Sequence, residues 1–504
     1  MSGYFVENFG CRATQADGAA LERQFEERGM VRASSPAQAS VVVMNTCTVT
    51  AGADQDARAA IRRVRRQNPE ARIVVTGCYA QRAPEEIAAL PGVSLVVGNS
   101  HKHQLAEIVG ATDANSAPDS SCGSEPDCSE PDFGWRSASS AAIEPASLHR
   151  ALASEGPAFV PLTSLTAPSP SDPQVASPIF VSDIFAHTEL LAAPVFDAAN
   201  ERTRPNLKVQ DGCDNRCSFC VIPFVRGQSR SLEIDRILRE VNVLVESGYR
   251  EVVISGINLG RWGRDLDARL QTSDAAFQQI TLDILIRTIL AETALEKLRI
   301  SSVEPMDWSD DLISLVAASP RIAKHAHVPM QSGSDAVLRR MHRKYRPWHY
   351  REKIEKIHAA MPTAAIGADV MVGFPGETDA EFEATRRMIQ ELPFTYLHVF
   401  TYSPRPGTPA AAMTNQVPVH LARERNRILR ELAAEKKRAF MRGFLGKPLD
   451  AITLNVVGND ANGEFTEALT DNYLKLRMRG RHDSNRWLRA QIEDVVDGAL
   501  VGAG

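Results

Sequence analysis

The run Gly212-Cys213-Asp214-Asn215-Arg216-Cys217-Ser218-Phe219-Cys220 decides how the rest of this sequence is interpreted. Its three cysteines have the spacing CxxxCxxC, and no further Cys or His follows closely enough to complete a set of four. Iron–sulfur clusters are normally held by four thiolates, so three in one short loop predict a [4Fe–4S] cluster with one iron open to another ligand. The alternatives are a zinc knuckle, which would require a fourth ligand, or three unrelated core cysteines.

The whole chain limits the possible classes of protein. Its 504 residues predict about three folded units. A net charge of −5 argues against a globally basic nucleic-acid binder, so any contact with RNA is expected to be local. No stretch has the apolar length of a membrane span, and the start, MSGYFVENFG, lacks the basic and apolar regions of a signal peptide. We therefore expect a cytoplasmic protein without membrane contact.

All cysteines lie at or before residue 220. In a reducing compartment, clusters of cysteines indicate metal or redox ligands rather than disulfides. The eight are Cys11, Cys47, Cys78, Cys122, Cys128, Cys213, Cys217 and Cys220.

Residues 1–110 alternate short apolar runs with helical patterns, which predicts a parallel sheet flanked by helices. Cys11, Cys47 and Cys78 each come just after an expected strand. The carboxyl ends of parallel strands share one edge, so these cysteines are expected to converge on a second three-thiolate site. The alternative is three buried, inert cysteines.

Residues 111–200 are rich in Ser, Pro, Ala and acidic residues. Such a segment buries too little apolar surface to define a fold, so we expect a linker or insertion that is largely disordered. We interpret Cys122 and Cys128, which lie in it, as incidental thiols.

Residues 201–430 again alternate strand and helix patterns, which favours a full or partial barrel of parallel strands. The cysteine loop follows the expected strand 206–210 and would lie at the carboxyl end of such a barrel. Residues 431–504 hold the end of a charged helix and several short strand patterns, which predict a small antiparallel β-barrel. Lys475, Arg477 and Arg479 beside Tyr473 suit RNA binding, although a solvated strand edge explains them nearly as well.

At this point the chain resembles the methylthiotransferase family of radical S-adenosylmethionine (SAM) enzymes, over its whole length except residues 111–200. The resemblance rests on six segments that occur in family order. They are Met44–Thr50 (MNTCTVT), Val75–Gln81 (VTGCYAQ), Gln210–Cys213 (QDGC), Gln331–Ser334 (QSGS), Gly373–Thr378 (GFPGET) and Tyr402–Ala411 (YSPRPGTPAA).

The resemblance implies an α/β multidomain protein: an N-terminal α/β domain, a radical SAM barrel and a TRAM-like barrel that grips RNA. It implies that Cys213, Cys217 and Cys220 hold the [4Fe–4S] cluster to which SAM binds. It further implies that Cys11, Cys47 and Cys78 hold an auxiliary [4Fe–4S] cluster. SAM would serve both as radical source and as methyl donor.

The exact residues within these motifs indicate which branch of the methylthiotransferase family the chain resembles. Asn45–Thr50, Ile61–Pro69 and Arg299–Pro305 are similar to the branch that converts N6-threonylcarbamoyladenosine at tRNA position 37 into its 2-methylthio form. The Arg12–Gly18 segment departs from the family pattern after the first cysteine. Isopentenyladenosine in tRNA and a ribosomal protein are the alternative substrates, and a non-catalytic iron–sulfur RNA-binding protein is the alternative class.

The unactivated C2–H bond of adenine is hard to break by acid–base chemistry, which favours radical chemistry carried by a cofactor. The resemblance implies an electron donor, such as flavodoxin or ferredoxin, and a source of sulfur as partners besides tRNA. Residues expected near SAM are Phe219, Gly256, Asn258, Glu304, Gly373 and Phe374. Residues expected to contact tRNA phosphates include Arg62, Arg63 and Arg66, whose alternative is a solvated helix face. For the residues expected near SAM, the alternative roles are ordinary turns, core packing and, at Glu304, a salt-bridged carboxylate.

Overall fold

The structure is a computed structural model that describes residues 3–114, 177–188, 190, 203–266, 280–460 and 463–504. The chain divides into a larger unit, residues 1–105 and 176–504, and a smaller one, residues 106–175. Of the smaller unit, only the part of helix α5 (Leu105–Ala114) that falls within it is described. Among the described helices, none has the length and apolar character needed to cross a bilayer.

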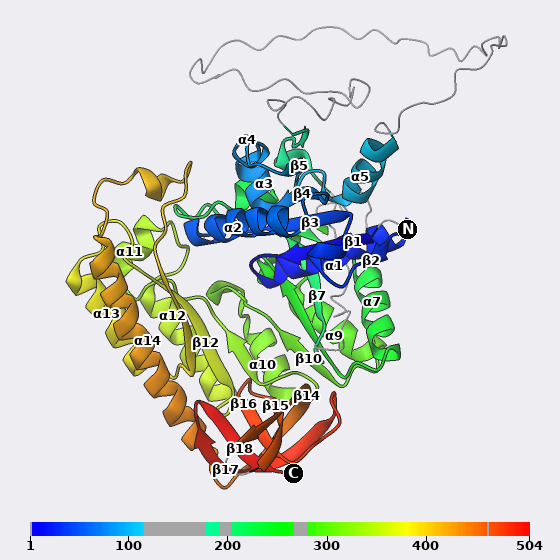
Figure 1. Ribbon diagram of the computed structural model, residues 1–504. Helices are drawn as coiled ribbons and strands as arrows, with labels where there is room; N and C mark the ends of the chain where they lie inside the picture. The colour runs from blue at the N-terminus through cyan, green and yellow to red at the C-terminus, as the bar shows by residue number, and fades with distance from the viewer. Residues whose placement is uncertain (1–2, 115–176, 189, 191–202, 267–279, 461–462) are drawn as a thin grey trace, which may run out of the picture. The chain divides into compact units, whose positions relative to one another are not determined.

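The N-terminal region forms the predicted parallel sheet, with strand order β2-β1-β3-β4-β5-β6 (Figure 1). Strand β3 is buried at every position, which is typical of a central parallel strand covered on both faces. The strands are β1 (Gly3–Asn8), β2 (Val31–Arg32), β3 (Val41–Thr46), β4 (Arg72–Gly77), β5 (Val93–Gly98) and β6 (Ile179–Phe180). The helices are α1 (Arg12–Glu26), α2 (Ala51–Gln67), α3 (Cys78–Arg82) and α4 (Pro84–Ala88).

Strand β6 lies within the segment predicted to be a linker. Ile179 and Phe180 pair in parallel with Val96 and Val97 of β5, and Ser177 donates to the carbonyl of Val93. The predicted linker of residues 111–200 therefore contains a structured piece, because two apolar residues suffice to extend a sheet edge that already exists. Cys122 and Cys128 lie outside the described residues.

The middle region is a partial barrel. Six parallel strands follow one another in chain order: β7 (Asn206–Asp211), β9 (Glu251–Gly256), β10 (Lys297–Ile300), β11 (His325–His327), β12 (Ala365–Val372) and β13 (Tyr396–Thr401). The ladder is interrupted between β10 and β11, where Leu298 bonds to the backbone of Arg321 and Ala323 instead. Short β8 (Arg230–Ser231) pairs antiparallel with β7.

Helices cover this barrel, and one large apolar core lies beneath them. They are α6 (Ile222–Arg226), α7 (Ile234–Glu246), α9 (Leu282–Glu292), α10 (Asp310–Ala318), α11 (Asp335–Arg340), α12 (Pro347–Ala360) and α13 (Asp379–Glu391).

The C-terminal region begins within helix α14 (Val419–Arg442), which runs without a break across the predicted boundary at residue 430. Five strands follow it (Figure 1): β14 (Pro448–Asp460), β15 (Gly463–Thr470), β16 (Lys475–Arg479), β17 (Trp487–Val496) and β18 (Ala499–Ala503). Their pairings close a ring in the order β14-β15-β16-β18-β17. The predicted antiparallel sheet is present, with one parallel pair in which β18, a strand that was not predicted, lies beside β16.

Candidate active site

The three-cysteine loop begins at Gly212, at the end of β7. Gly212 has φ of +74°, and a side chain there would place its Cβ 1.8 Å from the carbonyl oxygen of Gln228. The next residue, Cys213, donates its N–H to the carbonyl of Gly227 at 3.1 Å. Glycine is therefore required for the chain to turn out of the barrel and present half-buried Cys213, Cys217 and Cys220.

Hydrogen-bond donors face two of the three sulfurs. Cys213 Sγ lies 3.4 Å from the backbone N–H of Asn215 and 3.7 Å from Nδ2 of Asn258, and Cys217 Sγ lies 3.2 Å from Nη1 of Arg343. Donors of this kind stabilise the thiolates that hold an iron–sulfur cluster and tune its potential. Burial nevertheless raises the pKa of Cys213 to about 11, so its thiolate form depends on such donors or on a bound metal.

Arg343 connects this loop to Glu304. The buried guanidinium of Arg343 pairs with the Glu304 carboxylate and stacks on the ring of Tyr345, with 4.9 Å to the ring centroid. Burial raises the pKa of Glu304, and the charge of Arg343 opposes that rise. The structure places Glu304 beside the loop as a largely buried carboxylate that is paired with Arg343.

Phe219 and Phe374 meet edge to face, with ring centroids 6.4 Å apart, and Phe374 is fully buried. Gly373 has φ of +72°, and a Cβ there would lie 2.5 Å from the Cβ of Ala422 on α14. A tight turn and contact with a helix therefore account for this glycine. Nothing here requires a ligand at Gly373.

Gly256 and Asn258 follow β9 and lie against Gln210 of β7. The Asn258 N–H donates to Gln210 Oε1 at 2.7 Å, and a Cβ on Gly256 would lie 2.8 Å from the same oxygen. Oδ1 of Asn258 is buried and has no hydrogen-bond partner, so it is an acceptor available to a ligand beside Cys213.

Cys11, Cys47 and Cys78 also converge. Cys47 and Cys78 directly follow the parallel neighbours β3 and β4, and a Cβ on Gly10 would lie 3.0 Å from Cys47 Sγ. Burial, together with the neighbouring Cys78 and Cys11, raises the pKa of Cys47 to about 12. Cys11 is exposed, so this set opens to solvent on one side.

Neither cysteine set has the geometry of a mononuclear zinc site. In the described part of the chain, the one group of three metal-ligand residues with ligand atoms all within 4.8 Å of one another is His327, Asp369 and His398. Zinc–sulfur bonds of 2.3 Å in a tetrahedron would hold sulfurs about 3.8 Å apart. In each cysteine set at least one sulfur–sulfur distance exceeds 4.8 Å, which is longer than such a zinc site allows.

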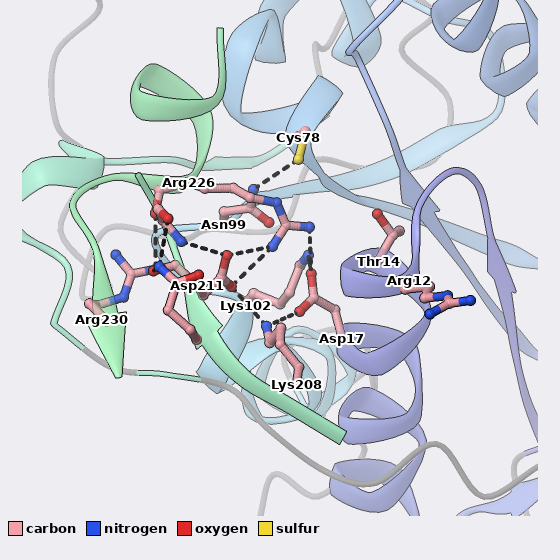
Figure 2. Close-up of polar contacts among 12 residues, drawn as sticks. Arg12, Thr14, Asp17, Cys78, Asn99, Lys102, Lys208, Asp211, Arg226 and Arg230 are labelled. Carbon is pink, nitrogen blue, oxygen red and sulfur yellow. Dashed lines mark hydrogen bonds and ion pairs between the residues drawn. The ribbon is translucent and has the colours of Figure 1, made fainter. Parts of the chain in front are cut away.

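A buried ionic network, which the sequence analysis missed, joins the two cysteine regions (Figure 2). Asp17 of α1 pairs with Lys208 of β7, with Lys102 at 3.1 Å and with Arg226 of α6 at 3.0 Å. Arg226 also pairs with Asp211 at 2.9 Å. The three cations against two carboxylates leave one positive charge in surplus. Burial lowers the pKa of Arg226, but the nearby acidic groups hold it well above its usual value; they are Asp211, Cys78, Asp17 and Cys11.

One signal was available in the sequence. Lys208 and Asp211 interrupt an otherwise strand-like run just before Cys213, and Asp17 lies in the segment that departs from the family pattern. Charged residues at such positions are buried only when they are paired.

The predicted RNA-contact residues lie at the surface in two separate places. Arg62, Arg63 and Arg66 are exposed on α2, with Arg63 paired to Glu7 at 2.5 Å. On β16, exposed Arg479 pairs with Glu493, and half-buried Arg477 lies over the ring of Phe465.

Exposed Lys475 lines a cavity of about 480 Å³ that further cations and two tyrosines share. The lining includes Arg204, Arg430, Lys437, Lys475, Tyr396 and Tyr473.

Comparison with known proteins agrees with this geometry. The Radical SAM superfamily model matches residues 207–389, and the model described as Uncharacterized protein family UPF0004 matches residues 3–98. A three-cysteine loop after the first strand of a partial parallel barrel, within the matched region, defines a radical SAM protein. That superfamily implies SAM and a [4Fe–4S] cluster.

Curated relatives specify the family. The Threonylcarbamoyladenosine tRNA methylthiotransferase MtaB of Aquifex aeolicus is 32% identical over 96% of this chain and 99% of its own length. That of Bacillus subtilis is 32% identical over 96% and 92%. The tRNA-2-methylthio-N(6)-dimethylallyladenosine synthase of Endomicrobium trichonymphae is 28% identical over 99% of both chains. The chain belongs to the radical SAM methylthiotransferase family that includes the MtaB proteins.

Proposed function

We propose that this protein is a tRNA methylthiotransferase that converts N6-threonylcarbamoyladenosine at position 37 into its 2-methylthio form. The observation that carries the proposal is the presence of two three-cysteine sets in one folded unit, joined through the Asp17–Arg226 ion pair. Near-full-length similarity to MtaB proteins supports the choice of substrate.

Two [4Fe–4S] clusters are proposed, one on Cys213, Cys217 and Cys220 and an auxiliary one on Cys11, Cys47 and Cys78. Bound there, the clusters and SAM would supply the radical chemistry that an adenine C–H bond requires. Three thiolates per cluster leave one iron open in each, which suits SAM at the first and sulfur at the second.

The chain's own residues prepare these sites. Arg343 and Asn258 donate to the thiolates of the first set, and the orphaned Oδ1 of Asn258 is placed to accept a hydrogen bond from SAM. Phe219, Gly256, Glu304, Gly373 and Phe374 would shape the surroundings of SAM. Glu304 would act mainly by holding Arg343 against Cys217.

We further propose that the C-terminal ring of strands is a TRAM-like RNA-binding barrel. Lys475 and the cations beside it in the 480 Å³ cavity suit phosphate, and Tyr396 and Tyr473 offer aromatic surface for a base. Arg62, Arg63, Arg66, Arg477 and Arg479 would extend the contact. A cytoplasmic location, a flavodoxin or ferredoxin as electron donor and a separate sulfur source belong to the same proposal.

The test is mass spectrometry of tRNA nucleosides from cells that lack the protein, with and without re-expression. We expect 2-methylthio-N6-threonylcarbamoyladenosine to disappear, to return with the wild type, and to stay absent with Cys217→Ala. An unchanged nucleoside profile would refute the tRNA assignment. A loss confined to 2-methylthio-isopentenyladenosine would move the substrate to that modification.

A further inference from the structure

Three neighbouring strands of the partial barrel bring His327, Asp369 and His398 together. None of the three lies within 100 positions, along the sequence, of a cysteine of either three-cysteine set. Asp369 of β12 is the direct cross-strand partner of His398 of β13, and His327 of β11 lies diagonally from Asp369. Each oxygen of the Asp369 carboxylate faces one imidazole: Oδ1 lies 3.2 Å from His398 Nδ1, and Oδ2 lies 3.2 Å from His327 Nε2.

Nε2 of His327 lies 3.2 Å from Oδ2 of Asp369 without the alignment of a hydrogen bond. Nε2 of His327 is buried and has no hydrogen-bond partner, although the side chain is only 6% exposed and the nitrogen faces a carboxylate. A buried ring nitrogen without a hydrogen bond is costly unless another group occupies its lone pair. The arrangement therefore leaves a place for a cation between the nitrogen and the carboxylate.

A neighbouring tyrosine orients His327. The Tyr396 hydroxyl lies 2.9 Å from His327 Nδ1 and 2.7 Å from His325 Nε2. Tyr396 can lie across these strands because position 367 is glycine, where a Cβ would come within 2.0 Å of the tyrosine ring. When Tyr396 donates its one proton to His325, His327 donates from Nδ1 to Tyr396 and directs the lone pair of Nε2 at Asp369. Such an outer hydrogen bond is what holds a metal-ligating histidine in the correct tautomer.

We propose that His327, Asp369 and His398 form a binding site for a divalent first-row transition-metal ion. The ligand atoms all lie within 4.8 Å of one another. The 3.2 Å contacts compare with about 3.4 Å between ligands at 2.1 Å from a tetrahedral ion. Two imidazoles and one carboxylate favour Zn²⁺ or Fe²⁺ over Mg²⁺ or Ca²⁺, which prefer oxygen ligands throughout.

The site has an entry path and an open side. The His398 side chain is 55% exposed and lines the cavity of about 480 Å³ next to Tyr396. A metal ion bound by these three side chains would keep one open coordination position, which would face this cavity. That is the arrangement of catalytic rather than structural zinc sites.

The test measures zinc and iron together in the cluster-loaded enzyme after anaerobic dialysis against Zn²⁺ and gel filtration. Wild type, His398→Gln and Asp369→Asn are compared, with His420→Gln as the control because His420 is an exposed histidine on α14. Since zinc captured by the cysteine sets would be the same in all four proteins, it cancels in the difference.

We expect the wild type and His420→Gln to retain about one more zinc per chain than His398→Gln and Asp369→Asn, at equal iron content. The extra zinc should raise the unfolding temperature of the wild type and not that of His398→Gln. Equal zinc content in the wild type and His398→Gln would overturn the proposal and assign the three residues to a metal-free hydrogen-bonded cluster.

Discussion

The guanidinium of Arg226 lies 3.0 Å from the carboxylate of Asp17, and both side chains are 2% exposed. Arg226 comes six residues after Cys220, and Asp17 comes six residues after Cys11. One buried ion pair therefore connects the segment that follows Cys11 with the segment that follows Cys220. The two segments lie in regions that match two different family models. The ion pair thus holds the two cysteine-bearing segments against each other.

Replacing Asp17 by Asn should destabilise the protein strongly. Lys208, Lys102 and Arg226 would lose their shared carboxylate in a buried site, and such a loss costs about 3–5 kcal/mol. Urea unfolding measures the change, with Asp56→Asn on the exposed side of α2 as control. An Asp17→Asn protein as stable as the control would show that the network is not important for folding.

The stabilising effect of Asp17 should depend on pH. Burial alone would raise its pKa, but Lys102, Lys208 and Arg226 lower it from 3.8 to about 2. Because the pKa is depressed in the folded state, the contribution is fully present above pH 4 and is lost as the pH falls toward 2. The stability difference between wild type and Asp17→Asn should shrink by about 2 kcal/mol over this range. Urea unfolding of cluster-free protein at several pH values measures it, and a constant difference would contradict the assignment.

The two cysteine sets should load with iron independently. Cys217→Ala should lower the iron content from about eight to about four atoms per chain and abolish SAM cleavage. Cys47→Ala should lose the same amount of iron and keep SAM cleavage, because Cys47 belongs to the other set. Loss of all iron in either variant would mean that the sets assemble as one. Iron analysis and product chromatography distinguish these results.

Arg343→Gln should lower the reduction potential of the cluster on Cys213, Cys217 and Cys220. The variant loses a cation that lies 3.2 Å from Cys217 Sγ, and positive charge or hydrogen bonds at sulfur stabilise the reduced cluster. An EPR-monitored redox titration in a Cys47→Ala background isolates this cluster. Arg339→Gln, at an exposed position on α11, is the control and should leave the potential unchanged.

Lys475→Gln should lower the affinity for tRNA and should make that affinity less dependent on salt concentration. Loss of one phosphate contact reduces the slope of log affinity against log salt by about 0.7–0.9. Binding of tRNA measured at several salt concentrations provides the slope. The control is Lys356→Gln, which removes an exposed cation from α12 that pairs with Asp310. Equal slopes for both variants would exclude Lys475 from the interface.

Much of the fold was predictable because its signals are local. The apolar run of β3 and the turn residues before Cys47 and Cys78 predicted parallel strands with cysteines at one edge, and the structure has both. Strand β6 was missed because it has two residues and pairs with a distant segment, and β18 was missed although it forms a hairpin with the preceding β17. The partner of Asp17 was also unpredictable, since Arg226 is 209 positions away.

The sequence by itself determined the two cysteine sets, their positions after strands and the resemblance to a family, because spacing and periodicity are properties of neighbouring residues. Only the tertiary structure decided which charges are buried together and that Glu304 is held by Arg343. It also brought His327, Asp369 and His398 to one point. The physical reason is that a buried charge or ring nitrogen must be satisfied by whichever group the fold brings against it, and that group comes from a remote part of the chain.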